Sequence, residues 1–310
     1  VSHLWARKGG WRGENVLDEL TVSGINSYLS AQREVVGDPL RLSSNANMSF
    51  QGSIVLGQGF VLKHEAAAKL LESDARNRDV LLPYLNGKDL NSRPDRSPSR
   101  WVINFYNWPL NRSADGVWEG ADERQKKLWL REGTVPVDYD GSVAEDYPEC
   151  LSIVEAEVKP ERTRKKSDGN FVLRSPLYRT WWIYADKRPA LYRAICGSDR
   201  VLVKAQVSST WAWEFVPNGW VYDAMLTVFP GCEWEEFAVL QSCVHLAWAL
   251  EYKTTMRTDL RYVQAKIFET FPFPQTDENL GGIAEEYHAR RSKILLERDV
   301  GLTAVYNLYN

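Results

Sequence analysis

The sequence predicts an α+β fold, in which a curved mixed or antiparallel sheet is flanked by helices and followed by a C-terminal helical segment. Short apolar runs separated by Pro217, Asn218 and Gly219 indicate several strands between residues 201 and 229. The run 235–252 has the apolar periodicity of a helix with one buried face. With 310 residues and 44% hydrophobic content, the chain is long enough to bury a large core.

The first part of the chain mixes helical and extended patterns. A short amphipathic pattern within 16–29 indicates a loosely helical lead-in, and the glycine-interrupted run 49–62 indicates strands with bulges or a close backbone approach. A helix is predicted over 64–71, and a strand over 100–106. Between them, the sequence favours a short helix before a turn at Gly87.

Residues 113–146 interrupt the strand-rich pattern and are predicted to form a surface insertion with a helix over 123–131. We therefore expect a domain over 1–275 and a C-terminal helical segment over 276–310. The remaining predicted elements are a helix over 181–195, strands over 201–207, 211–216, 220–222 and 225–229, the helix 235–252 and a charged helix over 283–297.

The net charge of −3 hides a very uneven distribution. Residues 159–204 hold twelve Lys and Arg against four Asp and Glu, whereas 113–158 hold four against twelve. If the basic block gathers on one face it forms a phosphate-binding surface, and otherwise the two blocks compensate each other in space. Thirteen Trp, fourteen Tyr and ten Phe indicate a core held by aromatic packing, with stacking surfaces available to nucleic acid.

The four cysteines are scattered without C-x-x-C spacing, which predicts neither a zinc site nor a disulfide framework. The four histidines are too dispersed for a metal cluster, and His245, on an apolar helix, is most simply a hydrogen-bonded core residue. No apolar run reaches the roughly 18 residues of a membrane span, and no signal peptide opens the chain. A reduced, cytoplasmic protein is expected, and its ends suggest a piece of a longer polypeptide.

Three charged residues, Arg257, Asp259 and Arg261, are spaced two apart and would leave the same face of a strand. A guanidinium can donate two hydrogen bonds to guanine, while a neighbouring carboxylate can accept one from the cytosine of the same pair. The spacing therefore fits a reader of base edges. It also fits a surface ladder of salt bridges, and spacing alone leaves both open.

Two other functions are compatible with the sequence. Pro94 and Asp95, followed far downstream by Glu157, Val158 and Lys159, imitate the PD and E-x-K pattern of metal-dependent nucleases. The proline-rich loop around Asp95 argues against this interpretation. A domain whose basic block binds an acidic protein segment is the other alternative.

Several segments together resemble one protein family. They are SFQGSIVLGQGF, LLPYLNGKDLNSRPDRSPSRWVINFYNW, EVKPER, WWIYADKRPALYRAI, LQSCVHLAWA, TDLRYVQAKIFETFPFP and GLTAVYN, in that order. The chain resembles the target recognition domain of the single-chain adenine-N6 DNA methyltransferases of type II restriction-modification systems, the type IIG and MmeI-like group. The first 45 residues and 113–144 lie outside the resemblance.

The resemblance implies a module that binds double-stranded DNA and performs no chemistry itself. An upstream methyltransferase domain of the same prokaryotic polypeptide would hold S-adenosylmethionine, and no cofactor is expected in this chain. The base-reading residues implied by the resemblance are Arg257, Asp259, Arg261, Asp223, Ser208, Ser209 and Thr210. The residues expected at phosphates are Lys159, Arg162, Arg164, Lys165, Lys166, Lys204 and Lys253.

Overall fold

The computed structural model describes residues 13–25, 39–252, 254–256, 259–275 and 279–308, and for 254–256 and 259 it describes the backbone alone. The chain divides into two units, Val1–Leu40 and Arg41–Asn310. In the first unit, β1 (Asn15–Leu17) and β2 (Leu20–Val22) form an antiparallel hairpin. Its two turn residues, Asp18 and Glu19, both have positive φ, which matches the twist of a two-residue hairpin. The helix expected within 16–29 is therefore wrong where the chain is described.

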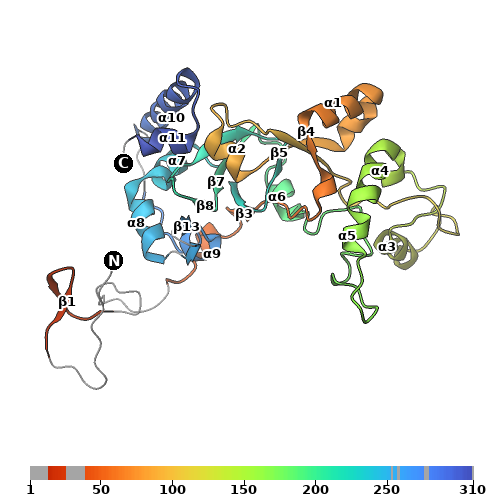
Figure 1. Ribbon diagram of the computed structural model, residues 1–310, viewed down its shortest axis with the longest axis horizontal. Coiled ribbons are helices and arrows are strands. Elements are labelled where there is room, and N and C mark those ends of the chain that lie inside the picture. The colour runs from red at the N-terminus through yellow and green to blue at the C-terminus, as the bar shows by residue number, and fades with distance from the viewer. Residues whose placement is uncertain (1–12, 26–38, 253, 257–258, 276–278, 309–310) are drawn as a thin grey trace. The chain divides into compact units, whose positions relative to one another are not determined.

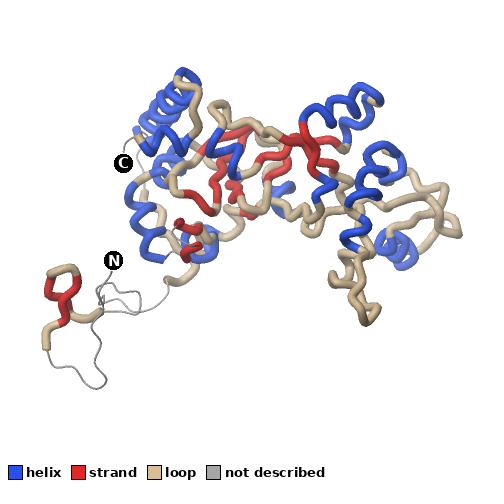
Figure 2. Tube along the Cα trace, viewed as in Figure 1, coloured by secondary structure: helices blue, strands red, loops and turns tan. Residues whose placement is uncertain are grey.

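The second unit contains three sheets with helices around them (Figures 1 and 2). The first sheet has the order β10-β5-β6-β4, with β10 parallel to β5 and the other pairs antiparallel. Its strands are β4 (Val61–Lys63), β5 (Leu81–Leu85), β6 (Arg100–Ile103) and β10 (Val221–Tyr222). The helical elements near it in sequence are η2 (Gln58–Phe60), α1 (His64–Ser73), η3 (Ala75–Asp79), α2 (Gly87–Ser92), α3 (Glu123–Glu132), η4 (Ala144–Asp146), α4 (Pro148–Glu157) and α5 (Lys159–Arg162).

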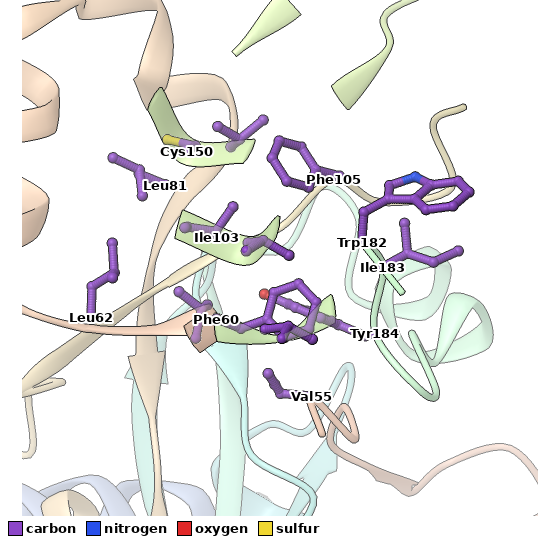
Figure 3. Packing of buried hydrophobic residues seen from close by; sticks show 14 of the residues in the cluster. Val55, Phe60, Leu62, Leu81, Ile103, Phe105, Cys150, Trp182, Ile183 and Tyr184 are labelled. Carbon is purple, nitrogen blue, oxygen red and sulfur yellow. The ribbon is translucent and has the colours of Figure 1, made fainter. Parts of the chain in front are cut away.

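An aromatic and aliphatic core joins this sheet to α4 and to the segment 181–184. Phe60, Phe105 and Ile103 are fully buried, and Tyr184 meets Phe60 edge to face with ring centroids 5.3 Å apart. Figure 3 shows these side chains together with Cys150 of α4. Because such rings bury large apolar areas, this cluster fixes the segment 181–184, which lies within the basic block 159–204.

The second sheet is antiparallel, with the order β3-β11-β7-β9. Its strands are β3 (Phe50–Gln51), β7 (Arg200–Ala205), β9 (Glu214–Pro217) and β11 (Leu226–Phe229). Both faces are buried, and the alternation along β7 assigns its residues to two cores: Val201 and Val203 pack on one face, with Leu191 of α6 (Pro189–Ala194), and Leu202 packs on the other.

The C-terminal part covers that second face. Its elements are α7 (Trp234–Gln241), α8 (Cys243–Tyr252), α9 (Gln264–Ile267), α10 (Asn279–Glu297) and α11 (Leu302–Asn307). The short helix η1 (Ser43–Asn45) lies on the same side, because the Asn45 side chain donates to the carbonyls of Phe268 and Phe271. Helix α10 packs against α7, and α11 packs against α2. Over the described ranges, no helix is long and apolar enough to cross a membrane.

The α+β class is confirmed, although the strands form three sheets rather than one. Two predicted helices are wrong in part. Residues 81–85, which precede Gly87, form β5, and the helix follows instead as α2, capped by the Asn86 side chain. Of the helix expected over 181–195 only 189–194 forms, because Pro189 starts it after a left-handed Arg188 while the preceding aromatic residues turn into the core.

The long helix expected over 235–252 is two helices that meet at Ser242. The Ser242 hydroxyl donates to the carbonyl of Val239 and accepts from the backbone of His245, so it closes α7 and opens α8. His245 itself is fully buried and hydrogen-bonded to Tyr262, as predicted.

Candidate nucleic-acid interface

A three-stranded antiparallel sheet unites two of the segments that the sequence singled out. Strand β13 (Asp259–Arg261) lies between β12 (Thr254–Met256) and β8 (Val207–Ser208), with Leu260 opposite Ser208 and Arg261 opposite Val207. We call it the recognition sheet. Just beyond β13, the backbone of Tyr262 donates to the carbonyl of Gln206 at 2.7 Å, which extends the pairing by one residue.

Another predicted base contact, Asp223, lies in a turn that is tied to the same place by Gln206. The backbone of Gln206 donates to the carbonyl of Met225 at 2.8 Å, and its side-chain amide donates to that of Ala224 at 3.0 Å. A second amide, from Gln51 of β3, reaches the Ala224 carbonyl at 2.8 Å. The structure therefore brings all three segments together, with a buried glutamine as their common contact.

The Asp223 carboxylate is partly exposed and is hydrogen-bonded on both oxygens. One oxygen accepts from the hydroxyl of Tyr84, and the other accepts from the backbone of Met225 at 2.7 Å. Burial, followed by this hydrogen bond to Asp223, raises the pKa of Tyr84 well above its usual value. Both carboxylate oxygens thus shape the turn, and Asp223, which is partly exposed, remains a predicted base contact.

An aromatic layer supports the recognition sheet from below. Trp211, Trp213 and Tyr262 surround each other, with centroid separations of 5.3 to 6.0 Å. The His245 ring nitrogen Nε2 lies 3.0 Å from the Tyr262 hydroxyl. Burial, and then the nearby Lys204 charge, lowers the pKa of His245 to about 3, so this histidine is neutral near pH 7.

Lys204 lies inside this layer, and its assignment to a phosphate is corrected. Its side chain is only 1% exposed, and its Nζ lies 4.4 Å from the Trp211 ring and 5.5 Å from the Trp213 ring. Lys204 leaves the same face of β7 as Leu202, which faces the aromatic core. Burial lowers its pKa to about 7. A charge enclosed by rings cannot pair with DNA phosphates.

Arg162 is a second correction of the same kind. Its guanidinium, also 1% exposed, donates to the carbonyls of Val55, Leu56 and Ile183 at 2.9, 2.6 and 2.6 Å and covers the Phe60 ring. Burial lowers its pKa to about 10. Arg162 therefore joins α5 to two loops of the core, and it offers no donor to a ligand.

The remaining predicted contacts differ in accessibility. Ser209 is exposed, whereas Thr210 is buried and its hydroxyl has no hydrogen-bond partner among the described residues. The Ser208 hydroxyl accepts from the Thr210 backbone at 3.0 Å. Arg261 is half-buried, and its Nε has no hydrogen-bond partner among the described residues. Arg257 and Lys253 lie outside the described residues, as does the side chain of Asp259.

The basic residues near α5 are mostly solvent-accessible. Lys159 is 43% exposed, pairs with Glu155 at 2.7 Å and covers the Trp181 ring. Arg164, Lys165 and Lys166 are exposed on the segment that follows α5. Lys159 and these three residues remain predicted phosphate contacts.

A groove of about 840 Å³ adjoins the recognition sheet. One wall is formed by residues 208–211 and Leu260, and the others come mainly from α7, α8 and α10. The lining side chains of these helices are mainly apolar, including Leu246 and Ile283. The groove therefore borders the sheet without adding charge to it.

The nuclease pattern does not assemble into a metal site. Among the described residues, no group of three or more His, Cys, Asp and Glu side chains is placed to hold a metal ion. The Asp95 carboxylate accepts from Ser97 at 2.6 Å and pairs with Arg93 at 3.3 Å. Partial burial raises its pKa, but the bonds from Ser97 and Arg93 outweigh this effect and lower it overall.

Two residues of the site were not predicted. Gln206 joins the three segments, but an isolated glutamine after a strand carries no pattern. Arg188 was expected on a helix; instead its guanidinium bridges Asp186 at 2.9 Å and the Gln51 side chain at 2.6 Å, and so supports the contact to Ala224. The only sequence feature that pointed to Arg188 was its place in the basic block 159–204.

Comparisons with known proteins agree with this arrangement. Residues 184–275 match the family model described as "MmeI, target recognition domain". The fold is similar to that of the type IIL restriction-modification enzyme MmeI, whose structure was determined in complex with DNA, with a TM-score of 0.58 and 16% identity over 93% of this chain and 33% of that one. The chain thus spans about a third of that enzyme. None of the curated proteins matches. The matched residues include the whole recognition sheet, and the resemblance predicted from the sequence is confirmed there.

Proposed function

We propose that this chain is the target recognition module of a restriction-modification DNA methyltransferase and reads a short sequence in double-stranded DNA. The observation that carries the proposal is the recognition sheet. It joins segments about fifty residues apart in the sequence, and both lie in the part of the chain that matches the target recognition family. The turn at Asp223–Met225, within the same match, is held beside it by Gln206.

A small antiparallel sheet is suited to this task because a two-stranded ribbon fits the major groove of B-form DNA. Positions spaced two apart on a strand, such as 259 and 261 of β13, fall on the same face of the ribbon. Arg257 would donate two bonds to a guanine, and Asp259 would accept from the paired cytosine. We therefore propose that one position of the target is a G·C pair, with Arg261 and Ser209 as neighbouring contacts.

The parent enzyme would transfer a methyl group from S-adenosylmethionine to the N6 atom of an adenine. That chemistry, and the residues that hold the methyl donor, would belong to a methyltransferase domain of the same prokaryotic, cytoplasmic polypeptide. The module described here would contribute binding energy. Rotating the adenine out of the duplex costs a few kcal/mol, and contacts to neighbouring base pairs offset that cost.

Selection from a randomised duplex library tests this function directly. The chain should enrich a defined short sequence, and the charge exchange Arg257→Asp with Asp259→Arg should change the preferred base at one position, by about 1–3 kcal/mol of discrimination. Ser73→Ala, which alters an exposed position on α1, serves as a control that should leave the enriched sequence unchanged. Uniform weakening at every position in the exchange variant would contradict the assignment of these two residues, and enrichment of no sequence would contradict the function.

A further inference from the structure

An exposed segment that follows α5 concentrates positive charge at a place separate from the recognition sheet. We call residues 164–179 the basic hairpin. Lys165 pairs across it with Phe171, and the backbone of Val172 donates to the carbonyl of Arg164 at 2.9 Å. The segment has five exposed cations and one acidic residue, Asp168. The cations are Arg164, Lys165, Lys166, Arg174 and Arg179.

Ring stacking orders the basic hairpin. The rings of Phe171 and Tyr178 are parallel, with centroids 3.9 Å apart. The Nζ of Lys165 lies 5.2 Å from the Phe171 centroid, and the guanidinium of Arg179 lies 5.8 Å from that of Tyr178. Since each ring gives one face to the other ring, the two cations take the outer faces. Cation–π contacts hold a charge in place while leaving N–H groups free for another partner.

Both ends of the basic hairpin are fixed in the core. Arg162, just before it, bonds to three core carbonyls, and Trp181 and Trp182, just after it, are buried. The basic hairpin is therefore held at both ends by the core, while its cations are exposed to solvent. None of its five cations forms an ion pair with the described part of the chain, so their charges are not compensated locally.

The basic hairpin and the recognition sheet stand on different cores. Trp181 and Trp182 belong to the cluster of Figure 3, whereas Tyr262, at the end of β13, belongs to the cluster under the second sheet. In Figure 1, α5, from which the basic hairpin continues, and β13 are well separated within the Arg41–Asn310 unit. A duplex held by the sheet would meet the hairpin only beyond the base pairs that the sheet reads.

We propose that the basic hairpin is a second, sequence-independent DNA contact that binds phosphates of the duplex flanking the recognised site. This inference rests on the proposed function. Phosphates fit better than a protein surface, because the segment exposes only one large apolar side chain, Val172, and protein interfaces require an apolar centre. The contact would add affinity and lateral mobility on DNA without adding specificity.

The decisive experiment compares short and long duplexes at several salt concentrations. One duplex ends about two base pairs beyond the selected site, and the other is extended on each side by about one and a half helical turns, roughly 15 base pairs. The neutralised variant carries Arg164→Gln, Lys166→Gln and Arg174→Gln, which leave the cations of the ring stack in place. The matched control carries Lys69→Gln, Arg78→Gln and Lys127→Gln, three exposed cations elsewhere on the unit.

On the long duplex, the neutralised variant should bind about tenfold or more weakly, and its log–log salt slope should fall by about 2 to 3, because each phosphate contact contributes about 0.9. On the short duplex it should match the control within about twofold. Restoring charge with Arg164→Lys, Lys166→Arg and Arg174→Lys should restore the slope, which excludes a folding defect. Equal losses on both duplexes, or no loss relative to the control, would overturn the inference.

Two further outcomes keep this inference separate from the proposed function. If selection yields no preferred sequence, long and short random duplexes still report whether the hairpin adds phosphate contacts. If the neutralised variant keeps its duplex slope but loses binding to poly-glutamate, the hairpin binds acidic protein and the DNA proposal for it is wrong.

Discussion

Two cations that charge alone would assign to DNA, Lys204 and Arg162, are buried and serve the fold. Lys204 lies among Trp211, Trp213 and Tyr262, and Arg162 bonds to core carbonyls. Their environments differ in one respect: Arg162 replaces its lost hydration with hydrogen bonds, whereas Lys204 is held mainly against ring faces. Buried charge is costly without such partners, so the two residues should respond differently to substitution.

Replacing Arg162 by Met should destabilise the protein by about 3–5 kcal/mol, because the carbonyls of Val55, Leu56 and Ile183 lose their donor inside the core. Urea denaturation followed by tryptophan fluorescence measures this change. The salt dependence of DNA binding by the folded fraction should not change. A reduced salt slope with unchanged stability would return Arg162 to the phosphate-contact group.

Replacing Lys204 by Met should change how stability depends on pH. The folded state lowers the pKa of Lys204 to about 7, so between pH 7 and its unfolded pKa the unfolded chain binds more protons. Lys204 therefore makes stability increase as pH rises above about 7, whereas below pH 7 its full cost is present. The Met variant should lack this increase, which amounts to about 1.4 kcal/mol per pH unit at most. The free energy of unfolding of both proteins is measured at pH 7, 8 and 9. The same change with pH in both would rule out a buried Lys204 with a lowered pKa.

At the scale of elements, the position of β3 depends on a glycine. A Cβ atom at Gly52 would overlap the backbone carbonyls of Tyr222 and Asp223, which come from the turn beside the recognition sheet. The close backbone approach predicted for the glycines of 49–62 is confirmed at this position. Any side chain at Gly52 would push β3 away from that turn.

Gly52→Ala is accordingly expected to destabilise the protein by about 2–4 kcal/mol and to weaken specific DNA binding more than binding to random duplex. Gly282→Ala on α10, where a Cβ meets nothing within 4 Å, is the matched control and should be neutral or stabilising by up to about 1 kcal/mol. Thermal melts and competition binding measure both. Equal effects of the two substitutions would show that the approach of β3 to the turn is unimportant.

Local patterns predicted some elements well and failed where tertiary contacts decide. His245 was predictable because a lone polar residue on an apolar helix needs a buried partner. The break at Ser242 was not, since it coincides with contacts of the Gln241 side chain, at the end of α7, to the backbone of Trp211 and Trp213, residues far away in sequence. Likewise the aromatic run at 181–184 has a helical pattern but is drawn into the core.

The same reasoning applies to the candidate site. The segments around β8, β13 and Asp223 were predicted to act together through a family resemblance, and the structure brings them together through Gln206. Positive charge alone led to the prediction that Lys204 and Arg162 bind phosphate. For Lys204, strand alternation already placed its side chain on the same face of β7 as the apolar Leu202. Whether such a face is exposed to solvent or buried depends on the helices that cover it. No local sequence pattern specifies where those helices pack.

At the scale of the whole unit, a buried charge cluster attaches α10 to the second sheet. Glu214 of β9 is fully buried, and its carboxylate lies 2.6 Å from His288, 3.0 Å from Arg291 and 3.4 Å from Arg96. Burial raises its pKa, but the bond from His288 and the charges of the arginines outweigh burial and lower the pKa overall. Three segments that are distant in the sequence therefore meet at one carboxylate.

Glu214→Gln should destabilise the unit by about 3–5 kcal/mol at pH 7, because it leaves buried guanidinium groups without their counter-charge. Since the folded pKa of Glu214 is lowered, its contribution to stability is present above the usual Glu pKa of about 4.5 and is lost as pH falls through the folded value. On acidification the variant should therefore lose less stability than the unsubstituted protein. Glu286→Gln, whose pair with Arg290 is exposed, is the control and should cost less than about 1 kcal/mol. An equal cost for the two variants would show that the cluster does not attach α10.

The backbone bonds of the recognition sheet also bear on how such proteins diversify. Leu260 and Ser208 are paired through main-chain atoms, and the layer of rings below holds that pairing whatever side chains project from the outer face. Residues at those outward positions can therefore be exchanged during evolution without refolding the platform. New target preferences would arise by drift at a few codons, while the tryptophans and Gln206 remain constrained.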